Sequence, residues 1–206
     1  IAADDGKRGV FYVPVTFLSH QGRLIAYVSN MVGHDRVTRC EAFVLDDEGR
    51  RWASRGYVAG PFLPNCAPRR MDDGNYIMAG RVAPEPAQLP ETPAVAISAG
   101  DDVLAPWTVV PMMRGSSRPY TDFPESTVWI DGAEITAVVR GGLVFTSNDY
   151  GRTWTGPFRH DLPAEDAKPY ALELGTGQRC LLWNRPEAPG TSRRLLVVAV
   201  GRPGEK

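Results

Sequence analysis

Glutamate and arginine residues at the ends of strand-like runs are the side chains of this sequence best suited to chemistry on a ligand. Glu125 precedes the run Val128-Trp129-Ile130, and Arg140 ends the apolar run that begins at Ile135. A carboxylate can accept or donate a proton, and a guanidinium can bind a planar anion through two parallel hydrogen bonds. Asp122, close before Glu125, could join it in acid–base work. Each of these residues is also compatible with a solvated side chain at the edge of a sheet.

Cysteine and histidine residues are too dispersed to indicate a metal site. Cys40, Cys66 and Cys180 lie far apart in the sequence, and so do His20, His34 and His160. None of them has a second ligand at the spacing that a zinc site requires. We therefore expect no metal and no cofactor, and we interpret the cysteines as buried free thiols.

Residues 147–154, Ser-Asn-Asp-Tyr-Gly-Arg-Thr-Trp, form the most informative motif of the chain. Asp149 can accept hydrogen bonds from the amides of a tight turn, Gly151 can adopt a positive φ, and Trp154 can cover the turn. A copy that lacks the serine begins at Asp47 and ends at Trp52, and a looser one runs from Ser98 to Trp107. The copies recur about every fifty residues, which is a period of repeat architectures.

A second repeating signal consists of glycine turns between two strand-like runs, a pattern that predicts β-hairpins. Four such hairpins are expected, around Gly22, Asp73-Gly74, Asp131-Gly132 and Gly177. Four strands per repeat, arranged around a common axis, are typical of the blades of a β-propeller. We therefore predict an all-β chain in which residues 1–206 form one partial propeller domain with repeats over residues 10–58, 59–112, 113–160 and 161–206.

Composition excludes several classes of function. Hydrophobic residues make up 43% of the 206 residues, yet no apolar run approaches the roughly 20 residues that span a bilayer. The formal net charge is −1 and the isoelectric point is near 6.4, which gives no electrostatic reason to expect nucleic acid as a partner.

The chain resembles the sialidase (neuraminidase) superfamily, whose members are six-bladed β-propellers with Asp-box repeats. The resemblance covers essentially all residues, and its most specific part joins three segments. These are Phe123 to Arg140, the octet that begins at Ser147, and Lys168 to Leu195. The resemblance implies that about four blades are present here and that the parent protein has six.

The resemblance also implies roles for individual residues. In that family a glutamate acts as the base toward a tyrosine nucleophile, three arginines bind the substrate carboxylate, and an aspartate is the general acid–base. Glu125 matches the glutamate, and Arg140 and Arg193 match two of the arginines. The tyrosine, the first arginine and the aspartate are not located, so we expect this segment alone to be catalytically incomplete.

Two further residues are candidates for contact with the substrate. Tyr170 precedes its turn glycine by the same number of residues as Glu125 does, so both could face the central funnel of the propeller. Tyr170 could equally be a packed tyrosine. Arg81 occupies in its repeat the place of Arg140 in the next, and a surface arginine is the alternative. Ser147, Asp149, Gly151 and Trp154 are expected to be structural.

The leading hypothesis is an exo-glycoside hydrolase of sialidase type that releases a terminal acidic sugar, sialic acid or a uronic acid, from glycans. The alternative from another class is a non-catalytic Asp-box propeller that binds glycans or proteins. A propeller polysaccharide lyase is a third hypothesis, for which His20, His34 and Tyr170 would be the acid–base candidates. Glycan-directed activity would suit secretion or the periplasm, although the sequence carries no targeting signal.

Overall fold

The computed structural model describes residues 10–32, 36–82, 91–113, 123–160, 167–185 and 195–202, and these residues form β-strands, turns and connecting segments. Within these ranges there is no helix, so none is long and apolar enough to cross a membrane. The prediction of an all-β chain is confirmed. All four predicted hairpins are also present, with their turns at the expected glycines.

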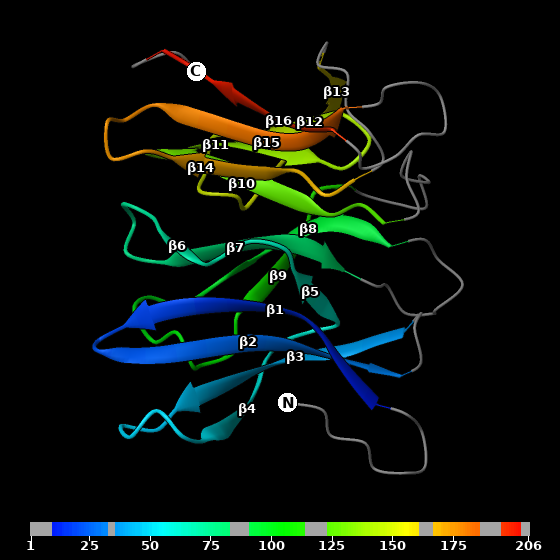
Figure 1. The fold of residues 1–206 in the computed structure, drawn as a ribbon. Coiled ribbons are helices and arrows are strands. Elements are labelled where there is room, and N and C mark those ends of the chain that lie inside the picture. Colours follow the sequence, from blue (N-terminus) through cyan, green and yellow to red (C-terminus); the bar gives the residue numbers. More distant parts are fainter. Residues whose placement is uncertain are drawn as a thin grey trace.

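Four antiparallel sheets follow one another in chain order, from blue to red in Figure 1. The first sheet has the order β1-β2-β3-β4 and consists of β1 (Val10–His20), β2 (Arg23–Val32), β3 (Arg36–Leu45) and β4 (Trp52–Ala59). The second has the order β5-β7-β8-β9, with β6 also paired to β7. It consists of β5 (Phe62–Pro64), β6 (Arg69–Arg70), β7 (Tyr76–Val82), β8 (Thr92–Ile97) and β9 (Thr108–Pro111).

The third and fourth sheets repeat the same meander. The third has the order β10-β11-β12-β13, with β10 (Ser126–Asp131), β11 (Glu134–Val139), β12 (Leu143–Ser147) and β13 (Thr155–Arg159). The fourth has the order β14-β15-β16, with β14 (Tyr170–Glu173), β15 (Arg179–Arg185) and β16 (Leu195–Val200). Sequential antiparallel strands joined by short turns keep each sheet a local unit of the chain.

The hydrophobic core lies between successive sheets rather than at one centre. In β7, alternate side chains point to opposite faces of the strand. Tyr76 and Met78 belong to the cluster shared with the first sheet, whereas Ile77 and Ala79 belong to the cluster shared with the third. A smaller cluster that contains Val138 and Trp183 joins the third and fourth sheets. Each inner sheet is therefore covered on both faces, which explains the apolar strands.

Hydrogen bonds between the sheets set how closely they approach. Ser126 Oγ of the third sheet donates to the Gly80 carbonyl of the second at 2.6 Å, and the Ala171 amide of the fourth donates to Thr127 Oγ1 at 3.0 Å. The guanidinium of Arg69 donates to the carbonyls of Val128 and Ala171 and so connects three sheets. These bonds join residues that are far apart in sequence but adjacent along the stack of sheets.

The three cysteines are buried and free, as expected. Burial raises the pKa of the Cys40 and Cys66 thiols, so both act as small neutral side chains of the core. Strand β16 differs from the inner strands because Leu196, Val198 and Val200 are all more than half exposed.

Candidate functional site

Glu125 and Arg140 form a largely buried ion pair at the end of the third sheet. The Arg140 amide donates to the Glu125 carbonyl at 2.9 Å, which extends the β10–β11 ladder by one residue. This bond places the two side chains next to each other, and Arg140 Nη1 lies 3.2 Å from Glu125 Oε2. The side chains are 10% and 19% exposed, respectively. Pairing within this ladder therefore brings together two residues that are fifteen positions apart in the sequence.

A second ion pair lies beside the first, on the second sheet. Arg81 is in β7, and its Nε is 2.8 Å from Oε2 of Glu91, which precedes β8. Arg81 follows Gly80, whose carbonyl accepts the hydrogen bond from Ser126, the neighbour of Glu125. The contact between the sheets thus positions Arg81 next to the Glu125–Arg140 pair.

Phe123 lies between the two sheets at this site. Its ring centroid is 5.1 Å from Cζ of Arg81 and 5.4 Å from Cζ of Arg140, distances typical of cation–π contacts. The Glu125 amide donates to the Phe123 carbonyl at 2.8 Å, so the ring and the carboxylate belong to the same turn. The phenylalanine is nevertheless 47% exposed. One exposed aromatic ring thus contacts an arginine from each of two sheets.

The described part of the site has two arginines and two glutamates, and the two arginines contact their partners through different nitrogens. Arg140 contacts Glu125 through Nη1, whereas Arg81 contacts Glu91 through Nε. Nε of Arg81 and Oε2 of Glu91 are fully buried and close to each other, but their geometry is that of an ion pair and not of a hydrogen bond. No hydrogen bond joins the terminal amino groups of Arg81 to a described residue. Its terminal fork can therefore donate two parallel hydrogen bonds to a planar anion.

Of the other predicted substrate-contacting residues only Tyr170 is described, and no hydrogen bond or ion pair joins it to the two ion pairs of the site. Tyr170 begins β14, and its neighbour Ala171 is buried in the cluster that faces the third sheet. Because side chains alternate along a strand, Tyr170 projects from the opposite face, and it is 39% exposed. Arg193 and Asp122 lie outside the described residues, as does His34.

Three residues near the site were not singled out as site residues by sequence reasoning. Glu91 and Phe123 contact the arginines, and no sequence signal distinguishes them from other residues beside a strand. Asn65 lies between β5 and β6. It is 4% exposed, and neither its side-chain nitrogen nor its oxygen has a partner in the described structure.

The Ser147–Trp154 turn lies at the other end of the third sheet, next to the β10–β11 turn. Tyr150 donates its amide to the Ala133 carbonyl, and Ser147 pairs with Ile135. Asp149 Oδ1 accepts from the Arg152 and Thr153 amides, Gly151 has φ +78°, and Trp154 Nε1 donates to the Gly151 carbonyl. Burial by itself would raise the Asp149 pKa, but hydrogen bonds from Thr153, Ser147 and Arg152 outweigh it and lower the pKa.

The weaker copies of this turn differ in detail. In the first sheet the carboxylate of Asp46, and not that of Asp47, accepts the turn amide, from Arg50 at 2.7 Å. In the second sheet Asp102 Oδ1 accepts from Leu104 and Ala105, and Trp107 Nε1 donates to the Val103 carbonyl. These side chains thus satisfy backbone groups of their own turns.

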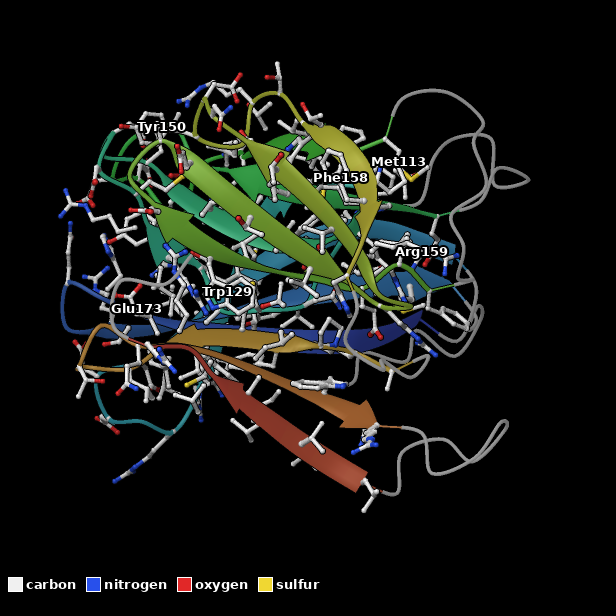
Figure 2. All side chains as sticks on the ribbon, turned by 90° about the horizontal axis from the view of Figure 1, so that it is seen from above. Met113, Trp129, Tyr150, Phe158, Arg159 and Glu173 are labelled. Carbon is white, nitrogen blue, oxygen red and sulfur yellow. The ribbon has the colours of Figure 1, made fainter. Side chains whose placement is uncertain are left out.

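Two pockets lie at the hairpin-turn end of the sheets. One of about 630 Å³ is lined by residues of three hairpins, including Arg69, Asp131 and Arg179, and Arg179 pairs with Asp131 at 3.4 Å. In Figure 2, Glu173 of this pocket lies at the end opposite Arg159, which pairs with Leu143 near Arg140. His20 lines the other pocket and contacts Tyr76 and Asp101. His20 is therefore far along the sheet from the site of Glu125.

The described residues contain no cluster of three or more histidine, cysteine, aspartate or glutamate side chains that could hold a metal ion. The concave space beside Arg140 between the third and fourth sheets is only about 10 Å³, which is too small for a sugar.

No protein-family model matches this chain, and no curated protein matches it in sequence. Solved structures do match. A protein of unknown function from Dyadobacter fermentans superposes with a TM-score of 0.69 at 14% identity over 96% of this chain. Penicillium chrysogenum α-L-arabinanase in complex with arabinobiose gives a TM-score of 0.64 at 14% identity over 92% of this chain. The chain is a β-propeller.

A sialidase is also among the structural neighbours. Trypanosoma rangeli sialidase, solved as a covalent intermediate with 2,3-difluorosialic acid, has a TM-score of 0.57 at 16% identity over 89% of this chain. The chain spans 62% of the length of each of the first two neighbours and 35% of the sialidase. The predicted fold class is confirmed, and identities this low carry the architecture alone.

Proposed function

We propose that the full-length protein is a glycoside hydrolase that removes a terminal sugar from a glycan and uses Glu125 as a catalytic carboxylate. The observation that supports this most is the Glu125–Arg140 pair, largely buried at the end of a propeller sheet and flanked by a second pair, Arg81–Glu91. The neighbours of known activity include an arabinanase and a sialidase, both of which act on glycans.

The position and the surroundings of Glu125 support this role. Hydrolysis of a glycoside requires a group that transfers a proton or activates a nucleophile, and a carboxylate fixed in orientation can do either. Arg140 holds Oε2 of Glu125 from one side, and the turn with Phe123 holds its backbone from the other. The carboxylate is 19% exposed, so it remains accessible to a substrate.

The sugar that we propose is acidic, such as sialic acid or a uronic acid, because two guanidiniums contact the same aromatic ring at the site. Arg140, Arg81 and, beyond the described residues, Arg193 would bind its carboxylate. A second candidate is a neutral pentoside. It is favoured by the existing ion pairs, since both described arginines already have a carboxylate within 3.2 Å.

Turnover by the full-length protein tests the proposal directly. Fluorogenic sialosides, uronides and arabinofuranosides would be assayed with wild type, Glu125→Gln and Arg140→Ala. Glu134→Gln is the matched control, because Glu134 is exposed at the turn end of the same hairpin. We expect Glu125→Gln to lower kcat/KM by about 100-fold or more and the control to stay near wild type.

Two outcomes would contradict this function. Wild-type activity of the Glu125→Gln variant would show that Glu125 is not a catalytic residue. No turnover of any substrate, with glycan binding retained, would instead support a non-catalytic binding propeller.

A further inference from the structure

Arg81 is the described arginine of the site whose hydrogen-bonding capacity is least used. Its side chain is 11% exposed, so most of the guanidinium is removed from water. Its Nε lies against Glu91, while the two terminal amino groups have no hydrogen-bond partner in the described ranges. Neither amino group is among the fully buried atoms that lack a hydrogen bond, so the fork keeps contact with solvent and is accessible to a ligand. A planar anion that accepts from both amino groups would use donors that no described residue uses.

The surroundings of Arg81 hold its fork in one orientation. Glu91 occupies the Nε edge at 2.8 Å, and the ring of Phe123 lies 5.1 Å from Cζ. A carboxylate on one edge and an aromatic ring nearby restrict rotation of the long side chain, which lowers the entropy lost on binding. The same ring lies 5.4 Å from Cζ of Arg140 and keeps the two cations at a defined separation.

We propose that Arg81 is the principal residue that binds the substrate carboxylate, and that Glu91 and Phe123 are positioning residues for its guanidinium. The ligand is a sugar acid, whose planar carboxylate matches the two parallel donors of the fork. Arg140 then serves chiefly to orient Glu125, with which it is already paired. This assignment rests on the proposed function, because it names the chemical class of its substrate.

Binding of free sugar acids tests the assignment without requiring catalysis. Isothermal titration of the full-length protein would use glucuronic acid and N-acetylneuraminic acid as probes and arabinose as the neutral comparison. The variants are Arg81→Lys, which keeps the charge but loses the fork, Phe123→Leu and Phe123→Tyr. Phe158→Leu is the control, because Phe158 is 48% exposed, close to the 47% of Phe123, but lies in the outer strand β13.

We expect Arg81→Lys and Phe123→Leu each to weaken binding of a sugar acid by about tenfold or more, a change that corresponds to about 1.4 kcal/mol. Phe123→Tyr, which keeps an aromatic ring, and Phe158→Leu should bind as wild type does. Arabinose binding should be the same in all variants, a pattern that a general loss of structure would not give. Thermal denaturation of each variant verifies that it is folded.

The result that would overturn the assignment is sugar-acid binding by Arg81→Lys and Phe123→Leu at wild-type strength, or no sugar-acid binding by wild type. Turnover of neutral glycosides without sugar-acid binding would support the proposed glycosidase activity and contradict the proposed role of Arg81. Sugar-acid binding that depends on Arg81, without turnover of any substrate, would support the binding role of Arg81 and contradict the proposed catalytic function.

Discussion

Residues of the same type act differently in this protein according to their partners. Arg81 and Arg140 occupy corresponding positions on neighbouring sheets, and both contact Phe123. Arg140 uses a terminal nitrogen to hold Glu125, whereas Arg81 uses Nε to contact Glu91 and leaves its fork available. A guanidinium presents its donors in a rigid plane, so the edge that is occupied decides what the other edge can bind.

At the residue scale, the ionisation of Asp149 should affect how the stability of the protein depends on pH. The pKa of Asp149 is lower in the folded protein than in the unfolded chain, where it is about 3.9. The ionised carboxylate therefore stabilises the folded protein above about pH 3.9, and this stabilisation is lost as the pH falls through the pKa of the folded protein. We expect Asp149→Asn to lower the free energy of unfolding by about 1 kcal/mol at pH 7, because several hydrogen bonds of the turn weaken. The difference from wild type should shrink below about pH 4.

Urea unfolding at pH 7, pH 5 and pH 3 measures this difference. Asp47→Asn is the control, since Asp47 is exposed and makes no hydrogen bond to any described residue. A difference between Asp149→Asn and wild type that is the same at all three pH values would show that ionisation of Asp149 does not stabilise the turn.

At the scale of elements, the site depends on how closely strands approach one another. Gly80 of β7 lies where β5 and β10 meet that strand, since Pro64 pairs with it and Ser126 donates to its carbonyl. A Cβ at this position would lie 2.0 Å from the Leu63 carbonyl oxygen and 2.7 Å from the Phe62 ring. Only glycine allows β5 to approach β7 in this way and thereby positions Arg81.

Replacement of Gly80 by alanine should therefore destabilise the protein by about 1–3 kcal/mol, because backbone atoms must move to accept the methyl group. Gly175→Ala is the control, since no atom lies within 4 Å of its added Cβ and its φ is not in the left-handed region. The free energy of unfolding in urea gives both effects. Equal stability of the two variants would show that the β5–β7 approach is not restrictive.

At the scale of the whole molecule, stability is shared unevenly among the sheets. Each of the two inner sheets packs on both faces, and β8 is buried along almost its whole length. The fourth sheet has a smaller cluster on one face, and β16 exposes Leu196, Val198 and Val200. Apolar surface that stays in contact with water contributes nothing to folding.

We expect the amides of β16 to exchange with solvent faster than those of β8, because local opening requires less buried surface to be exposed. Hydrogen–deuterium exchange of the 206-residue chain measures this difference. Protection of β16 equal to that of β8 would mean that the sheets open together as one unit rather than separately.

Local sequence was sufficient for the architecture and for much of the candidate site. Asp-Gly and single glycines between β-rich runs predicted the hairpins, and ladder pairing across the hairpin at Gly132 brings Glu125 to Arg140. The roles of these two residues stay predictions. The role of Tyr170 also stays a prediction, and spacing along the sequence does not give the face on which it projects, because that face depends on how β14 packs against the third sheet.

The sequence by itself determined the all-β class, the hairpins and the turn that ends at Trp154, because these depend on interactions between residues close along the chain. Only the tertiary structure decided that Arg81, Glu91, Phe123 and the Glu125–Arg140 pair share one site. Those contacts cross from one sheet to the next, and their geometry is set by packing and by close approaches such as that at Gly80. Local patterns in the sequence do not encode such distances.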